Sequence, residues 1–198
     1  MAKKYYAVKK GIKPGIYETW DECKKQVQGY SGAEYKSFTT LEEAQAFIEE
    51  KKVMQKVEGK SLLAYVDGSY NIKTKEYGYG CVLLDEVGVI DQLYGKGDNE
   101  ENTSMRNVAG EILGSETAID YAIQHDYKAI YIYYDYEGIE KWANGIWKAN
   151  KTGTKAYQEN IKEKRNKIVI EFIKVLAHSG DKYNEIADKL AKKAVGIK

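Results

Sequence analysis

The chain is poor in the residues that build covalent or zinc-bound scaffolds. Its 198 residues include two cysteines, Cys23 and Cys81, and two histidines, His125 and His178. The cysteines show no pairing pattern, so a disulfide-stapled domain is excluded and both are expected to be free thiols in a reducing compartment. So few cysteines and histidines also exclude a structural zinc site.

The sequence also lacks a segment long and apolar enough to span a membrane, and its N-terminus lacks the apolar core of a signal peptide. We therefore expect no membrane partner and a cytoplasmic location. An excess of one charge is missing too, because 31 basic and 30 acidic residues leave a net charge of +1. A nucleic-acid site must then come from local clustering. One such cluster comprises Lys3, Lys4, Lys9, Lys10 and Lys13. These lysines either bind nucleic acid or simply form a solvated face at the N-terminus.

Hydrophobic residues make up 43% of the chain, enough for a core, and their pattern divides it into two units. The first is expected to span residues 1–49 in the order β-β-α-β-α. Thr19 and Thr40 are N-cap candidates for its helices, each followed three residues later by a glutamate, as in a capping box. The charged residues 50–60 indicate a linker. The second unit is then residues 61–198.

The second unit alternates strand and helix patterns. Its expected elements are strands at 61–66, 77–84 and 88–94, a helix at 104–124, a strand at 129–134, helices at 137–148 and 155–165, a strand at 168–176 and a helix at 182–195. Three strands followed by α-β-α-β-α predict a mixed sheet with helices packed on it.

Four carboxylates, each in a short motif of its own, are the most informative feature of the second unit. Asp67 and Asp135 follow apolar strands, Glu111 lies in a helix, and Asp188 lies in the final helix. Carboxylates that converge in a fold repel one another, and a bound cation offsets that repulsion. Hard oxygen ligands select Mg²⁺ or Mn²⁺, and two such ions roughly 4 Å apart are an arrangement that cleaves phosphodiesters.

Each carboxylate has a plainer explanation as well. Asp67 precedes Gly68 and suits a hairpin turn, and Asp135 suits a turn or a helix cap. Ligand sites in α/β sheets lie at the carboxyl ends of strands, so both aspartates share one crevice if their strands are parallel neighbours. Glu111 lies at the border of the apolar stripe of its helix. Its side chain is therefore either a surface residue or one that faces a cleft. The position of Asp188 permits a cleft-facing role without requiring it.

As a set, these motifs resemble those of type-1 ribonucleases H over residues 61–198. The resemblance implies a five-stranded mixed sheet flanked by helices, and an enzyme that cuts the RNA strand of RNA–DNA hybrids with Mg²⁺. The residues that carry it are Tyr65-Val66-Asp67-Gly68-Ser69, Asn107 with Glu111, Tyr134-Asp135, His178-Ser179-Gly180 and Asn184-Glu185 leading to Asp188.

The resemblance also implies roles for single residues. His178, otherwise an incidental loop histidine, would be a catalytic residue that takes part in proton transfer or product release. Asn107, together with Ser69, would contact the minor groove of the hybrid. The catalytic groups and metal ligands would be Asp67, Glu111, Asp135 and Asp188.

The first unit resembles the hybrid-binding domain that precedes some ribonucleases H, through residues 5–11, 19–23 and 35–38. In that family an aromatic pair packs on the DNA strand while backbone groups meet RNA 2′-hydroxyls. The alternative role for Trp20 is to fill the core of this small unit instead of binding the hybrid. Ser37 stands where a basic residue is common, which puts one phosphate contact in question. The substrate-binding residues implied are Tyr6, Trp20, Tyr35 and Lys36.

The two resemblances imply an endonuclease that hydrolyses the RNA strand of hybrids by two-metal-ion catalysis, leaving 5′-phosphate and 3′-hydroxyl ends. Its cofactors would be two Mg²⁺ ions, with Mn²⁺ as a substitute, and a monomer is expected. Double-stranded RNA is left open as a second partner of the first unit. Two rivals also stay open: a nuclease of the same fold that acts on DNA, and a non-catalytic binder of hybrid or double-stranded RNA.

The segment between Asp135 and His178 is shorter than in many family members, which carry a long basic helical handle there. It keeps Trp142, Trp147 and several lysines, but no separate handle helix is expected. Our hypothesis is that the first unit supplies the substrate affinity that the handle gives elsewhere.

Overall fold

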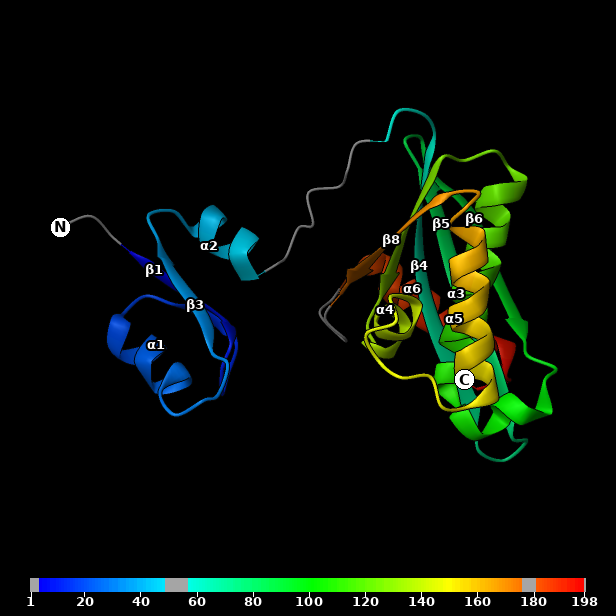
Figure 1. Ribbon diagram of the computed structural model, residues 1–198, viewed down its shortest axis with the longest axis horizontal. Coiled ribbons are helices and arrows are strands. Elements are labelled where there is room, and N and C mark those ends of the chain that lie inside the picture. The colour runs from blue at the N-terminus through cyan, green and yellow to red at the C-terminus, as the bar shows by residue number, and fades with distance from the viewer. Residues whose placement is uncertain (1–3, 49–56, 176–180, 198) are drawn as a thin grey trace. The chain divides into compact units, whose positions relative to one another are not determined.

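The computed structural model describes residues 4–48, 57–175 and 181–197, and the chain divides into two compact units, residues 1–55 and 56–198 (Figure 1). The expected linker, residues 50–60, falls largely outside the described residues. Cys23 and Cys81 are buried free thiols, as predicted. Among the described helices, none combines the length and apolar character that crossing a bilayer requires.

The first unit has the predicted β-β-α-β-α order. Its three strands form an antiparallel sheet in the order β2-β1-β3. Side chains of a strand alternate between its two faces, so Val8 packs under α1 with Cys23 and Val27, while its neighbour Ala7 faces away from that cluster. The elements are β1 (Tyr5–Lys10), β2 (Gly15–Tyr17), α1 (Trp20–Val27), β3 (Glu34–Phe38) and α2 (Leu41–Ile48).

Both helices of the first unit begin at the predicted caps. The backbone N–H of Glu22 donates to the Thr19 hydroxyl at 3.3 Å, and that hydroxyl donates to the Glu22 carboxylate at 2.8 Å. The backbone N–H of Glu43 likewise donates to the Thr40 hydroxyl at 3.2 Å. These bonds satisfy backbone donors that the first turn of a helix otherwise leaves without partners.

The second unit is built on a five-stranded mixed sheet in the order β6-β5-β4-β7-β8, which confirms the predicted fold class. β4, β5 and β6 are antiparallel neighbours, whereas β7 runs parallel to both β4 and β8. Its elements are β4 (Ser61–Asn71), β5 (Glu76–Asp85), β6 (Gly88–Lys96), the 3₁₀ helix η1 (Glu100–Met105), α3 (Asn107–Gln124), β7 (Ala129–Tyr134), α4 (Gly138–Ala143), α5 (Thr152–Lys164), β8 (Val169–Lys174) and α6 (Lys182–Ala194).

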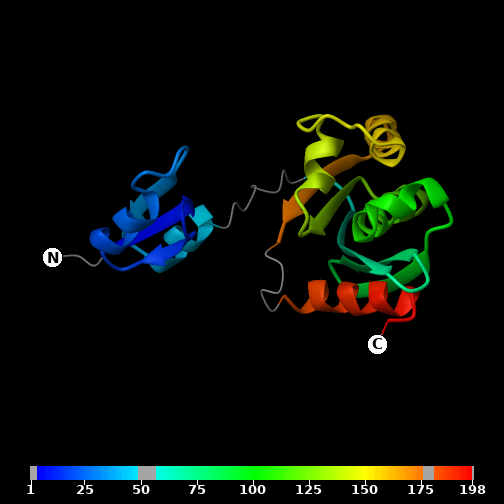
Figure 2. The same ribbon diagram turned by 90° about the horizontal axis from the view of Figure 1, so that it is seen from below.

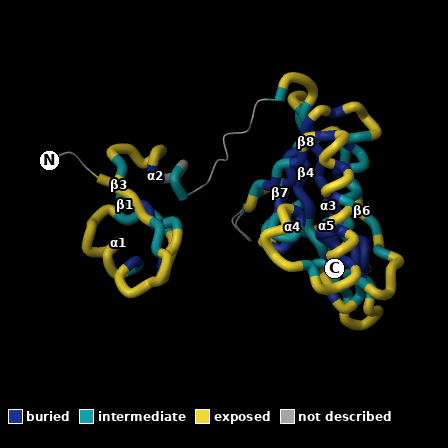
Figure 3. Tube along the Cα trace, in the orientation of Figure 1, coloured by how far each residue is buried: buried dark blue, intermediate teal, exposed yellow. Residues whose placement is uncertain are grey.

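Helices cover both faces of this sheet. Figure 2 shows α6 along one face, with α3 and α5 on the other. The larger core cluster joins Val66 and Ile132 to Ile112 of α3 and Ile161 of α5. The smaller cluster lies under α6, where Ala187 packs against strand residues of β4 and β5. The central strands are accordingly the most buried part of the chain trace (Figure 3).

Strand β4 is longer than the sequence pattern predicted. The expected strand ended at Val66, but β4 continues to Asn71 because β5 pairs with it from Leu63 to Asn71. Its parallel pairing with β7 stops at Tyr65. Asp67 therefore lies inside a strand, and the hairpin-turn explanation for the Asp67–Gly68 pair is wrong.

The buried face of α6 consists of small side chains. Ile186 and Leu190 are only partly buried, whereas Ala187 and Ala191 are fully buried. The reason lies in β5, where a Cβ added at Gly80 would come within 2.0 Å of the Ala187 carbonyl oxygen. Only small side chains fit where two backbones approach so closely.

Candidate active site

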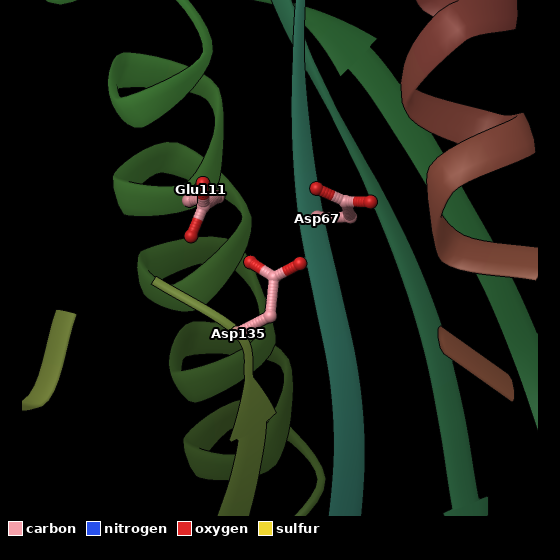
Figure 4. Close-up of side chains that lie close together, drawn as sticks. All are labelled: Asp67, Glu111 and Asp135. Carbon is pink, nitrogen blue, oxygen red and sulfur yellow. The ribbon is translucent and has the colours of Figure 1, made fainter. Parts of the chain in front are cut away.

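Strand register brings Asp67 and Asp135 together. Tyr65 of β4 and Tyr133 of β7 are partners in the parallel ladder, so the residues two positions further on are neighbours as well. β7 ends at Tyr134, which leaves the flank of β4 at Asp67 without a strand beside it. The Asp135 side chain turns into that opening next to Asp67 (Figure 4).

Glu111 reaches the same opening because α3 lies very close to the sheet. A Cβ added at Gly68 would lie 2.5 Å from the Glu111 backbone nitrogen, and one at Gly110 would lie 2.0 Å from the Gly78 carbonyl oxygen. Each glycine is next in sequence to a carboxylate of the site. The missing side chains allow the helix and the strand to meet backbone to backbone, and this approach delivers Glu111 beside Asp67 and Asp135.

Asp67, Glu111 and Asp135 form a carboxylate triad in which one oxygen from each lies within 4.8 Å of the others. Glu111 is 2% exposed, and its Oε2 has no hydrogen-bond partner among the described residues. The backbone N–H of Tyr136 donates to the Glu111 carboxylate, and that of Gly68 donates to Asp67 Oδ1 at 2.7 Å. A buried anionic oxygen without a partner is costly, and a cation bound by the triad would satisfy it.

The charges of the triad oppose one another. Burial, followed by the negative charge of Asp135, raises the pKa of Asp67 to about 7, although the Gly68 N–H and the ammonium of Lys192 act in the opposite direction. Burial, together with the charges of Asp135 and Asp67, also raises the pKa of Glu111 well above its usual value. The ionised triad is therefore an unfavourable arrangement that a divalent cation would stabilise.

Asp188 lies near the triad but outside it. Its charge contributes to the raised pKa of Asp67. It is held by Lys192, whose Nζ lies 2.7 Å from Asp188 Oδ2 one helical turn away on α6. Asn184, one turn before Asp188, is 7% exposed, and its side-chain oxygen has no hydrogen-bond partner among the described residues.

The donor set of this site consists of carboxylate oxygens, which suits Mg²⁺ or Mn²⁺ and not softer metals. The triad can hold one cation. The charge of Asp188 also acts on Asp67, so these two side chains could together hold a second cation.

The remaining candidate residues of the second unit lie around the triad or outside the described residues. Ser69 is two residues after Asp67 on β4 and nearly buried. Asn107 is exposed at the first residue of α3, where its carbonyl oxygen lies over Gly68. His178 falls outside the described residues.

Three of the four predicted hybrid-binding residues meet on one surface of the first unit. The rings of Tyr6 and Trp20 lie 5.8 Å apart, and those of Trp20 and Tyr35 lie 5.7 Å apart. Trp20 is 41% exposed and Tyr35 is 46% exposed, so Trp20 does not fill the core. Lys36 follows Tyr35 and points to the other face of β3, where its ammonium lies 5.5 Å from the Phe38 ring centroid.

An acidic residue that is distant in sequence, Glu34, pairs with the lysine cluster at the N-terminus. β1 and β3 pair so that Lys10 is the partner of Glu34, and the Lys10 ammonium donates to the Glu34 carboxylate. Lys9 lies 4.0 Å from the same carboxylate. Part of the positive charge of this cluster is therefore neutralised by a residue distant in sequence.

Sequence reasoning missed two kinds of functional residue. Gly78, Gly80 and Gly110 permit the close approach of α3 and α6, and the only signal for them was glycine inside strand and helix patterns. Lys192 was missed because a lysine four residues after an aspartate on a helix is common at surfaces.

Comparisons with known proteins divide the chain in the same way. Residues 4–48 match the family model described as the ribonuclease H1 N-terminal domain, and residues 59–196 match the RNase H model. A ribonuclease H of Wolbachia pipientis is 31% identical over 69% of this chain and 96% of its own length.

A second relative matches a shorter stretch of the chain. A ribonuclease H of Saccharomyces cerevisiae is 57% identical over 22% of this chain, and the matching region covers only 13% of that relative's length. Among solved structures, RNase H1 of the archaeon Halobacterium salinarum superposes with a TM-score of 0.58 at 20% identity, over 69% of this chain and 98% of its own. That likeness concerns the fold.

Proposed function

Because this chain belongs to the ribonuclease H family, we propose that it hydrolyses the RNA strand of RNA–DNA hybrids with two divalent cations as cofactors. The observation that carries the proposal is the buried carboxylate triad, in which Glu111 Oε2 has no hydrogen-bond partner among the described residues. Three converging anions in a desolvated opening suit a cation and suit no other ligand as well.

In this proposal Asp67, Glu111 and Asp135 hold one Mg²⁺, Asp67 and Asp188 hold the other, and Mn²⁺ is a substitute. When bound, the ions supply an activated water and stabilise the departing 3′-oxygen, which leaves 5′-phosphate and 3′-hydroxyl ends. Lys192 forms an ion pair with the Asp188 carboxylate, and its positive charge partly offsets the negative charge around Asp67. His178 retains its proposed role in proton transfer or product release.

Substrate recognition in this proposal involves both units. Asn107 and Ser69 contact the minor groove beside the triad, where 2′-hydroxyls mark the RNA strand. Tyr6, Trp20 and Tyr35 offer an exposed aromatic surface of the kind that packs on sugars and bases. A monomeric state, a cytoplasmic location and an affinity of the first unit for double-stranded RNA are further parts of the proposal.

Digestion of end-labelled RNA paired with DNA, with and without Mg²⁺, tests the proposal. We expect cleavage of the hybrid that depends on Mg²⁺, stops with EDTA and is absent in Asp67→Asn. Single-stranded RNA and duplex DNA are the controls. Preferential cleavage of duplex DNA would favour the rival nuclease, and binding of hybrid without cleavage under any divalent cation would favour the rival binder.

A further inference from the structure

Three tyrosine rings join the elements that carry Asp67, Asp135 and Asp188. Tyr65 in β4 and Tyr133 in β7 are register partners, and their rings stack with centroids 4.3 Å apart and planes 11° from parallel. Tyr183, in the first turn of α6, packs against Tyr65 with a centroid distance of 5.4 Å. We call these three residues the tyrosine column.

The residues of the column precede the carboxylates closely along the chain. Tyr65 and Tyr133 each stand two residues before an aspartate of the triad, and Tyr65 shares a face of β4 with Asp67. Tyr183 stands in the turn of α6 that leads to Asp188. The ring contacts therefore link three backbone segments, each of which carries a carboxylate of the site a few residues further on.

Further contacts hold the column in place. Tyr65 is 9% exposed and belongs to the core cluster under α6. The Asp181 carboxylate caps α6 by accepting from the backbone N–H groups of Tyr183 at 2.9 Å and Asn184 at 3.2 Å. Burial, and then the charge of Asp181, raise the pKa of both Tyr65 and Tyr133.

We propose that the tyrosine column is a positioning device that holds the carboxylates of Asp67, Asp135 and Asp188 at the spacing needed to bind divalent cations. The inference rests on the proposed function only in taking these carboxylates as metal ligands. Like charges push the strands and the helix apart at this end of the sheet, and the stacked rings resist that push. Stacked aromatic pairs prefer one geometry, which aliphatic packing does not impose.

The test measures Mn²⁺ binding to the whole chain by electron paramagnetic resonance of the free ion, without substrate. Tyr65→Leu removes the stack, Tyr65→Phe keeps it, and Tyr131→Leu is the matched control. Tyr131 is a buried tyrosine on the same face of β7, one step further from the site. We expect Tyr65→Leu to weaken Mn²⁺ binding about three- to tenfold, the effect of losing an aromatic pair, and Tyr65→Phe to restore it to within about twofold.

Tyr183→Leu and Tyr183→Phe repeat the test from α6, in case Tyr65→Leu does not fold. The proposal is overturned if the leucine variants bind Mn²⁺ like the wild type, or if Tyr131→Leu weakens binding equally, since general core packing then explains the effect. Asp67→Asn, which should lose the bound ion, identifies the site. If the leucine variants behave as expected but the wild type cleaves no hybrid, the proposed function fails while the positioning role stands.

Discussion

Gly110 of α3 lies so close to Gly78 of β5 that a methyl group added to it would sit 2.0 Å from the Gly78 carbonyl oxygen. We predict that Gly110→Ala pushes α3 away from the sheet and moves Glu111 out of the triad. Hybrid cleavage should fall by roughly tenfold or more, and the free energy of unfolding by about 1–3 kcal/mol, because a packed interior resists added volume. Initial rates and urea denaturation measure the two effects.

Gly114→Ala is the matched control for that prediction. It lies one turn later on the same helix, where the three atoms nearest to an added Cβ all belong to the side chain of Tyr79, the first at 3.2 Å. Both substitutions gain about 1 kcal/mol of helix propensity. Equal activities of the two variants would show that the contact with Gly78 does not position Glu111.

The raised pKa of Asp67 predicts how the stability of the metal-free protein depends on pH. Folding favours the protonated carboxyl, so stability is greatest below the ordinary pKa of an aspartate and falls as pH rises towards about 7. Glu111 adds to this fall in the same direction. Urea denaturation in EDTA between about pH 4 and pH 8 measures it.

Asp67→Asn removes the charge while its side-chain oxygen can still accept from the Gly68 N–H. We expect this variant, inactive in cleavage, to be more stable than the metal-free wild type by about 1–3 kcal/mol near pH 8, with the difference vanishing near pH 4. Asp98→Asn, at an exposed aspartate between β6 and η1, serves as the control outside the triad. A variant less stable than the wild type near neutral pH would contradict the strain that we assign to the triad.

Divalent cations should offset the loss of stability that the wild type shows as pH rises. If the folded triad binds Mg²⁺ as we propose and the unfolded chain does not, the melting temperature should rise with Mg²⁺ concentration, most strongly near neutral pH. Asp67→Asn and Glu111→Gln should show little of this rise. An equal rise in these variants would mean that the cation acts elsewhere on the protein.

Loss of the exposed tryptophan should weaken hybrid binding without unfolding the first unit. Trp20→Ala removes the ring between Tyr6 and Tyr35, and we expect hybrid affinity to fall about tenfold, which is the order of one aromatic stacking contact. Tyr30→Ala is the control, since Tyr30 is a 44% exposed ring of the same unit that belongs to no such group. Fluorescence anisotropy with a labelled hybrid compares the two variants, and equal affinities would contradict the assignment.

Removal of residues 1–56 tests whether the first unit supplies affinity to the second. We expect hybrid affinity to fall roughly tenfold or more, because two linked modules bind more tightly than one. The salt dependence of binding should also become shallower, since the lysines of the first unit no longer contact phosphates. Cleavage at saturating hybrid should persist. Unchanged affinity would refute our hypothesis that the first unit replaces the handle.

Short-range patterns predicted much of this protein. Thr19 and Thr40 correctly predicted where their helices begin, because an N-cap hydrogen bond joins residues only three positions apart. The motifs grouped Asp67, Glu111, Asp135 and Asp188, and the structure brings the first three together while Asp188 lies outside the triad. The end of β4 was missed because its length depends on β5, and Lys36 was grouped with Tyr35 although alternation along β3 separates their side chains.

The sequence by itself determined the chemistry that is available: oxygen ligands for a hard cation, exposed rings for a nucleic acid, and alternating strands and helices that form a mixed sheet. Tertiary structure alone decided that the pairing of β7 with β4 stops short of Asp67 and that the backbone of Gly110 meets that of Gly78. It also decided that the charge of Lys192 partly offsets the negative charge near the triad. The physical reason is that propensity and periodicity act over a few residues. Desolvation, charge repulsion and close backbone approach depend instead on groups that only folding brings together.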